Sequence, residues 1–334
     1  MSVAKPSEIK LVILMPVFND WRALSLLLPS LEHELKAAGL RASLLLVDDG
    51  STVPVPEDFF TANSCPSDFQ SIESVDVLAL RRNLGHQRAI AVGLSYIEAK
   101  RPCDAVIIMD ADGEDDPRDV PRLVKESVAN DNQKIIFAAR ARRMENLTFK
   151  LFYQFYRLIH FLLTGISVRV GNFSVIPWGA LNRIVAVSEL WNHYAAAVYK
   201  ARLPLALIAT QRSRRLEGSS RMNFVALVVH GLSAMAVFGD RIGVRLLIVV
   251  IIGMGLASGG LIVVFAIRLL TIVAVPGWVA YFAGIILLMM WQMMPVVLVF
   301  VFMILASRDT ASIIPSRDYV HLTAGVRRVH GYNR

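Results

Sequence analysis

The chain has 334 residues, of which 55% are hydrophobic, and its formal net charge is +8 at pH 7. This hydrophobic fraction is high for a soluble protein, and the basic balance is typical of proteins that bind nucleic acid, anionic lipid or a phosphate-bearing substrate. The two cysteines, Cys65 and Cys103, lack the spacing of a metal site or a disulfide framework, which excludes a fold held together in either way.

The first two thirds of the chain alternate short apolar runs with helix-like stretches. Each run is bounded by charge, glycine or proline, as buried parallel strands are. This alternation predicts an α/β domain with a mainly parallel sheet, in which ligands bind at the carboxyl ends of the strands. We expect strands at 11–18, 43–48, 75–80, 104–110 and 135–139, and helices at 21–38, 86–100 and 117–129.

Two segments after this alternation are predicted to lie at a membrane surface. Residues 146–163 mix aromatic and aliphatic side chains with basic ones, which is typical of an interfacial amphipathic helix, although a core helix of the domain also fits. Residues 222–240 are uncharged up to Gly239 and are expected to form a juxtamembrane helix. A spanning helix here would carry Arg241 and Arg245 across the membrane, against the positive-inside rule.

Two long uncharged runs follow, Leu246–Ile267 and Leu269–Ser307. Each exceeds the ~20 residues that cross a bilayer, and Pro276-Gly277 breaks the second run near its start. We therefore expect a transmembrane hairpin over 241–307, with helices at about 242–267 and 278–306. Arginines cluster on both flanks of the hairpin, beside the apolar runs, which fits contact with anionic headgroups, and we expect no nucleic acid as a partner. The same clusters place the domain (1–221) and the basic tail (308–334) in the cytoplasm.

Three polar clusters lie where expected strands end. Asp110-Ala111-Asp112 presents two carboxylates that would repel each other unless a divalent cation such as Mg²⁺ or Mn²⁺ joined them, although the acidic run also fits a cap before the helix that opens at Pro117. Asp48-Asp49-Gly50-Ser51 either accepts hydrogen bonds from a base or ribose or forms an ordinary Asp-Gly turn. The segment 16–20, PVFND, either holds a nucleobase or caps the following helix.

The order of these clusters, with the segment 82–87 (RNLGHQ) between the second and the third, resembles the family 2 glycosyltransferases of the GT-A fold. A closer similarity is to polyprenyl-phosphate glycosyltransferases, which include dolichol-phosphate mannosyltransferases and bacterial undecaprenyl-phosphate sugar transferases. It rests on Phe155 to Leu158, on the stretch 215–221 (RLEGSSR) and on a closing hairpin with Pro276-Gly277-Trp278. The resemblance covers residues from about 10 to 306.

The resemblance implies roles for single residues. Asp112, Arg140 and Arg157 would be catalytic, and Asp110, Asp112 and Glu114 would surround the cation. The donor would be bound by Pro16, Phe18, Asn19, Asp20, Asp48, Asp49, Gly50, Ser51, Asn83, Gln87, Asp110 and Ala111. Acceptor and diphosphate would be held by Arg140, Arg157, Arg215, Ser219, Ser220 and Arg221, since arginine pairs bidentately with phosphate. A rim that binds lipid headgroups is the alternative for these arginines.

The sequence departs from the family pattern at two places. Glu114 stands where relatives usually have glutamine, and the stretch 169–173, RVGNF, lacks the two acids of the D-x-G-[DN]-F pattern at Arg169 and Asn172. An acceptor phosphate is already ionised at pH 7 and needs little help from a base, so the change is expected to affect the choice of sugar.

The implied activity is transfer of a sugar from a UDP- or GDP-sugar to polyprenyl phosphate, with inversion, by a metal-dependent multi-pass enzyme of a bacterial-type plasma membrane. The family also implies a homo-oligomer, a dimer or a tetramer. Two alternatives remain. A processive polysaccharide synthase would have a Q-x-x-R-W stretch, whereas the segment 211–215 has no tryptophan; a non-catalytic membrane scaffold would keep only the fold.

Overall fold

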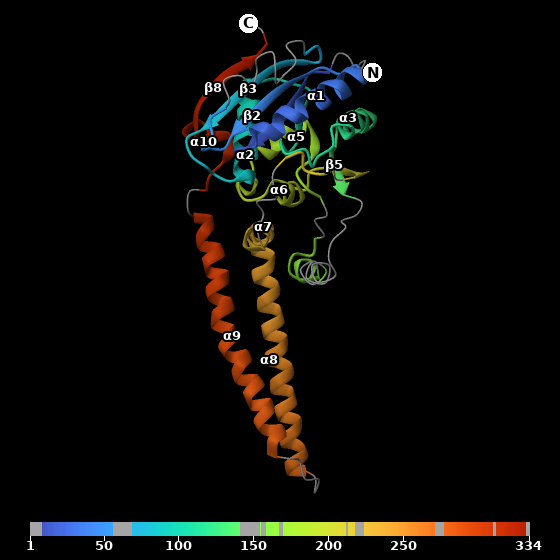
Figure 1. Ribbon diagram of the computed structural model, residues 1–334. Helices are drawn as coiled ribbons and strands as arrows, with labels where there is room; N and C mark the ends of the chain where they lie inside the picture. The colour runs from blue at the N-terminus through green and yellow to red at the C-terminus, as the bar shows by residue number, and fades with distance from the viewer. Residues whose placement is uncertain are drawn as a thin grey trace. The chain divides into compact units, whose positions relative to one another are not determined.

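The computed structural model (Figure 1) describes residues 9–55, 69–140, 154, 158–166, 170–211, 213–217, 224–270, 277–309 and 312–331. The chain forms two compact units. The first, here called the sheet unit, comprises Met1–Asn146, Val168–Val237 and Ile313–Arg334. The second, the helical unit, comprises Leu147–Ser167 and Phe238–Ser312. The end of the chain therefore returns to the unit in which it began.

The sheet unit is built on one eight-stranded sheet with the strand order β7-β5-β6-β4-β1-β2-β3-β8. Its centre is parallel, because β1 pairs in parallel with β2 and β4, and β2 with β3. β6 runs antiparallel between β4 and β5, and β7 is parallel to β5. The strands are β1 (Leu11–Val17), β2 (Ala42–Asp48), β3 (Ile72–Leu80), β4 (Ala105–Ile108), β5 (Ile135–Arg140), β6 (Ser174–Pro177), β7 (Leu205–Thr210) and β8 (Thr323–His330).

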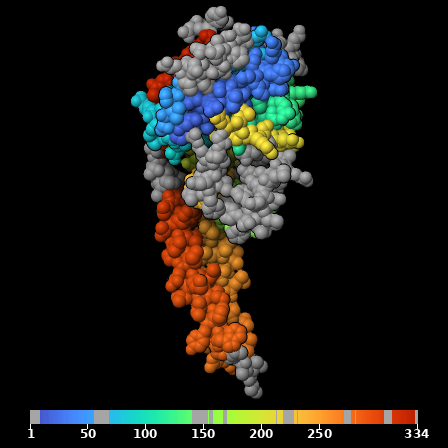
Figure 2. Space-filling model, in the orientation of Figure 1, coloured from blue at the N-terminus to red at the C-terminus, as the bar shows by residue number. Residues whose placement is uncertain are grey.

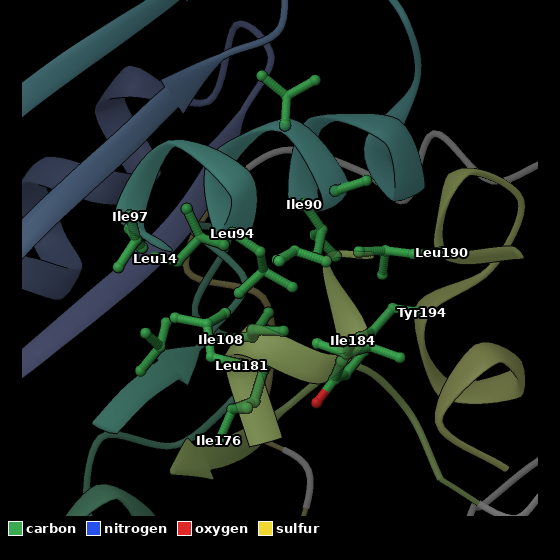
Figure 3. Packing of buried hydrophobic residues seen from close by; sticks show 14 of the residues in the cluster. Leu14, Ile90, Leu94, Ile97, Ile108, Ile176, Leu181, Ile184, Leu190 and Tyr194 are labelled. Carbon is green, nitrogen blue, oxygen red and sulfur yellow. The ribbon is translucent and has the colours of Figure 1, made fainter. Parts of the chain in front are cut away.

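Helices cover both faces of this sheet, because the central strands are apolar on both sides. Side chains of β1 alternate between two cores: Ile13 and Met15 face one, and Leu14 faces the other. α1 buries leucines at helical spacing in the first core, and α3 buries Val120, Leu123 and Val124 there. Figure 3 shows the second core, where Leu14 meets Ile90 and Leu94. The helices of this unit are α1 (Trp21–Ala37), α2 (His86–Lys100), α3 (Asp119–Ala129), α5 (Trp178–Ile184), the 3₁₀ helix η2 (Ser188–Trp191), α6 (Tyr194–Lys200), α7 (Phe224–Ala236) and α10 (Pro315–Leu322).

The close packing of α2 on the sheet depends on a glycine. A Cβ atom on Gly93 would lie 2.4 Å from Leu14 Cδ1 and 2.8 Å from Val47 Cγ2, so only a residue without a side chain fits there. Gly93 therefore lets α2, whose first two residues are His86 and Gln87, pack closely on β1 and β2.

The expected basic tail (308–334) has its own secondary structure from residue 315 onward, and Ile313–Arg334 belongs to the sheet unit. It supplies α10 and then β8, which pairs antiparallel with the edge of β3. Asp76 on β3 is buried between Arg101 and Arg328, and Arg328 Nε donates to it at 2.9 Å. Because β8 lies at the edge and most of its side chains are exposed, it lacks the apolar run by which a buried strand is recognised.

The helical unit contains α8 (Gly239–Leu270) and α9 (Gly277–Asp309), which pack side by side in Figure 1 and Figure 2. Both are long and apolar enough to cross a membrane, and almost none of their apolar surface is buried. Their bounds include the expected helices at 242–267 and 278–306.

The same unit holds a short helix at 158–164, part of the predicted interfacial helix. Leu158, Phe161 and Leu162 are exposed on it, and Arg245 Nη1 at the start of α8 donates to Leu162 O at 2.7 Å. Most of the remaining residues of that prediction lie outside the described residues.

Candidate active site

The loops that follow β1, β2 and β4 meet at one edge of the sheet, as the parallel topology requires. They bring together the three polar clusters of the sequence. The segment 213–217 crosses the same edge from far along the chain. We call this place the mouth of the sheet.

On one side of the mouth, the loops after β1 and β2 are tied to each other. Asp48 Oδ1 accepts a hydrogen bond from Ser51 N at 2.9 Å, and Ser51 Oγ accepts one from Asn19 N at 3.0 Å. Asn19, with φ of +59°, accepts in turn from Val53 N at 2.9 Å. Asparagine tolerates this left-handed conformation better than most residues. The two loops therefore form one polar ledge, beside which Phe18 is partly exposed.

Asp49 lies beneath this ledge and is 3% exposed. Its two carboxylate oxygens accept hydrogen bonds from Leu84 N at 2.6 Å and Gly85 N at 2.9 Å. Burial raises the pKa of Asp49, although these two hydrogen bonds work in the opposite direction. Gly50 has a φ of +67°, and its backbone approaches Arg82 and Asn83 closely. The Asp49-Gly50 pair thus fixes the loop that begins α2, and contact of either residue with the donor stays a prediction.

The acidic pair lies on the other side of the mouth. Asp112 Oδ1 accepts from Glu114 N at 3.0 Å, and its Oδ2 lies 3.3 Å from Arg215 Nη1. The second nitrogen of this guanidinium, Nη2, lies 2.8 Å from Asp20 Oδ1. Asp20 occupies the N-cap position of α1 but makes no side-chain cap there. Its carboxylate faces Arg215 instead, so one arginine joins the loops after β1 and β4.

Asp110 is flanked by a residue that the sequence analysis did not single out. His86 Nε2 lies 3.3 Å from Asp110 Oδ1 and 3.0 Å from Asn172 Nδ2. Desolvation of the ring lowers the pKa of His86, but the charge of Asp110 and its hydrogen bond outweigh this and raise the pKa. Gln87, predicted to bind the donor, donates to Asn172 Oδ1 at 3.1 Å and accepts from Tyr194 N at 2.8 Å. The only signal for His86 in the sequence is its place in the RNLGHQ segment.

Two further acids hold the loop after β4 in place. Asp115 is buried and accepts from Asp110 N at 3.0 Å. Asp116 accepts from Arg118 N and Nε, both at 3.0 Å, and from Ser213 Oγ at 2.9 Å. These contacts, chiefly the hydrogen bond from the Arg118 side chain, lower the pKa of Asp116 to about 2. Asp116 thus acts in the turn before α3, which begins at Asp119, two residues after the expected start.

The carboxylate oxygens at the mouth suit a hard divalent cation. Asp110 and Asp112 offer carboxylate oxygens, with 23% and 16% of their side chains exposed. Within the described ranges, no three His, Cys, Asp or Glu side chains are already arranged to hold a metal together. The predicted place of Glu114 beside the two aspartates stays a prediction. Mg²⁺ commonly uses one or two carboxylates, with water and substrate phosphates as the other ligands.

The other predicted site residues divide into three groups. Pro16 and Ala111 are buried, Pro16 within β1 beside Val47 of β2, and so support the mouth from below. Asn83 is exposed, and Arg140 ends β5 beside Thr210. The remaining predicted residues lie outside the described residues: Arg157, Arg169, Ser219, Ser220 and Arg221.

Comparison with known proteins bears on this arrangement. Residues 12–190 match the model of the family described as Glycosyl transferase family 2. The undecaprenyl-phosphate 4-deoxy-4-formamido-L-arabinose transferase of Photorhabdus laumondii is 30% identical over 138 residues, which are 41% of this chain and 39% of that protein. The match thus spans about two fifths of the relative's length.

Solved structures resemble the chain over a larger share. Mannosyl-3-phosphoglycerate synthase from Rubrobacter xylanophilus covers 70% of this chain, with 74% of its own, at a TM-score of 0.50 and 14% identity. Glucosyl-3-phosphoglycerate synthase from Mycobacterium tuberculosis, crystallised with Mn²⁺, UDP and phosphoglyceric acid, covers 71% of this chain with 80% of its own, at a TM-score of 0.50 and 14% identity. This likeness confirms the predicted GT-A fold.

Proposed function

The chain belongs to glycosyl transferase family 2, and we propose that it transfers one sugar from a UDP- or GDP-sugar to polyprenyl phosphate, with inversion at the anomeric carbon. The observation that carries the proposal is the acidic pair Asp110 and Asp112 at the mouth, opposite the polar ledge of the first two loops, in a chain that also has two helices able to span a membrane. The ledge suits a nucleoside, the acids suit a cation on a diphosphate, and the helices suit a lipid acceptor.

The lipid acceptor is further supported by the named activity of the Photorhabdus relative, which acts on undecaprenyl phosphate. The Mycobacterium synthase was crystallised with Mn²⁺ and UDP, which supports a divalent cation and a nucleotide at the mouth. Either Mg²⁺ or Mn²⁺ fits carboxylate oxygens.

The proposed reaction is a single displacement. A phosphate oxygen of the lipid forms a bond to the anomeric carbon, the bond from that carbon to the donor diphosphate breaks, and the nucleoside diphosphate leaves. Asp110 and Asp112 would hold a divalent cation, which would neutralise charge on the leaving diphosphate. Asn19 and Ser51 position the nucleoside. Because the acceptor oxygen is anionic at pH 7, no residue of the chain has to remove a proton from it.

The membrane arrangement follows from charge. Arginines lie near the start of the first candidate span and beyond the end of the second, including Arg241 in the first turn of α8 and Arg317 after α9. By the positive-inside rule we expect the mouth on the cytoplasmic side, with the acceptor phosphate in the adjacent headgroup layer. The exposed apolar side chains of the short helix at 158–164 would lie in that layer.

The test is transfer of label from a panel of radiolabelled UDP- and GDP-sugars to undecaprenyl phosphate, in membranes that contain the protein. We expect one donor to label the lipid, and expect EDTA and Asp112→Asn each to abolish the label. Asp131→Asn is the matched control, since Asp131 is exposed in a turn after α3 with φ of +53°, a conformation that asparagine tolerates. Folded protein that labels no lipid with any donor would contradict the proposal.

A further inference from the structure

A short segment, the strap (residues 213–217), is fastened across the acidic side of the mouth. Ser213 N donates to Glu114 O and Leu216 N to Asp112 O, both at 3.0 Å. A Cβ atom on Gly113 would lie 2.4 Å from Leu216 Cγ, so the leucine side chain packs directly on this glycine. Two backbone hydrogen bonds and one packing contact therefore attach the strap to the loop after β4.

The strap carries a cation into the acidic mouth. Arg215 has 15% of its side chain exposed and lies between two carboxylates, 2.8 Å from Asp20 Oδ1 and 3.3 Å from Asp112 Oδ2. Its Nε donates to Glu217 O at 2.9 Å, which orients the guanidinium from within the strap. Arg22 Nε on α1 lies 3.1 Å from Glu217 Oε2 and secures the far end.

The guanidinium of Arg215 lies beside the Asp112 carboxylate, where a divalent cation would bind. One oxygen of Asp112 accepts the Glu114 amide and the other faces Arg215, so a cation held directly by this carboxylate would share it with the guanidinium. A guanidinium and a divalent cation held on one carboxylate would also repel each other. The two are thus competitors for Asp112.

We propose that Arg215 is the counter-ion of Asp112 and Asp20 while no metal is bound, and that a divalent cation displaces it and loosens the strap. This inference rests on the proposed function for the presence of a cation at the mouth. Displacement would free Asp20 at the same time, so the nucleoside ledge and the metal site open together.

The test measures Mn²⁺ binding to the full-length protein in detergent, without nucleotide or lipid, by the electron paramagnetic resonance signal of free Mn²⁺. We expect Arg215→Ala to bind Mn²⁺ on the order of tenfold more tightly than the unaltered protein, because a charge-assisted contact no longer competes. Arg215→Lys should lie between the two. Arg214→Ala is the matched control, because this exposed neighbour removes the same charge from the same strap without a contact to Asp112. Equal or weaker binding by Arg215→Ala, an equal gain in Arg214→Ala, or no Mn²⁺ binding by any of these proteins would overturn the inference.

A second variant keeps Arg215 but removes a contact that holds the strap in place. Leu216→Ala removes the packing on Gly113, and we expect it to tighten Mn²⁺ binding, by less than Arg215→Ala does. In the unaltered protein, Mn²⁺ should speed hydrogen exchange at the amides of Ser213 and Leu216, whereas slower exchange there would contradict displacement of the strap. If Arg215→Ala binds Mn²⁺ more tightly but the protein transfers no sugar, only the proposed function is refuted. If the protein transfers sugar but Arg215→Ala binds Mn²⁺ no more tightly, only this inference is refuted.

Discussion

Gly50→Ala tests whether the turn after β2 sets the loop that begins α2. Gly50 has a φ of +67°, where alanine is disfavoured by about 1–2 kcal/mol. Its added Cβ would lie 2.6 Å from Asn83 N and 2.8 Å from Arg82 C, both of them backbone atoms that can move only if the loop moves. Overpacking of this kind costs about 1–3 kcal/mol, and a stiffer unfolded chain returns about 0.4–1 kcal/mol. We expect a loss of about 2–4 kcal/mol in the free energy of unfolding.

Gly39→Ala is the control for the conformational part of this cost. Gly39 has a φ of +64°, nearly the same as Gly50, but a Cβ there meets nothing within 4 Å. We expect Gly39→Ala to cost about 1 kcal/mol and to leave the KM for the donor unchanged. Gly50→Ala should also raise that KM, since the moved loop carries Asn83 and is held by Asp49.

Denaturant unfolding of the detergent-solubilised protein, followed by far-UV circular dichroism, gives the two free energies, and initial rates of transfer give the KM. The reasoning is refuted if Gly50→Ala and Gly39→Ala lose the same stability. It is also refuted if Gly50→Ala loses stability without any change in donor KM, because the loop would then not be part of the site.

Three further changes test the packing and charge of the sheet unit. Asp76→Ala should cost about 3 kcal/mol, because it breaks the buried ion pair that holds β8, and should speed tryptic cleavage at Arg328; unchanged cleavage would count against this. Gly93→Ala should lower the free energy of unfolding by about 1–2 kcal/mol, because the clash of the added methyl group with Leu14 outweighs the gain in helix propensity. A lower melting temperature would confirm this, and a stabilised variant would show that Gly93 is not closely packed. Asp116 has a pKa lowered from 3.8 to about 2, so it contributes stability above pH 3.8 that is lost as the pH falls toward 2. We therefore expect acidification to lower the free energy of unfolding of the unaltered protein by about 1–2 kcal/mol more than that of Asp116→Asn. Equal acid sensitivity of the two proteins would show that the Asp116 carboxylate does not stabilise the fold.

Much of the sheet unit is predictable from sequence because its central strands are buried on both faces. β1 and β2 read as unbroken apolar runs and were expected to within one residue of their bounds. Four-residue β6 pairs antiparallel inside the sheet, and β8 is an exposed edge strand, so neither gives such a run and neither was predicted.

The site was predictable as a set of strand ends but not as a set of contacts. Asp110 and Asp112 were placed at the mouth because parallel strands share one carboxyl edge. The roles of Asp49 and Arg215 could not be read in the same way. Asp49 faces backbone amides 35 and 36 positions away, and Arg215 meets Asp20 from 195 positions away. Such pairings are set by tertiary packing, which leaves no periodic signal in the sequence.

The most direct test of the central claim is the stoichiometry of one reaction. The purified protein, with the donor that labels lipid best, undecaprenyl phosphate and Mn²⁺, should release one nucleoside diphosphate for each lipid product formed. Mass spectrometry of that product should show undecaprenyl phosphate carrying a single sugar. Release of nucleoside diphosphate without glycosylated lipid, or a product that carries a chain of sugars, would contradict the account.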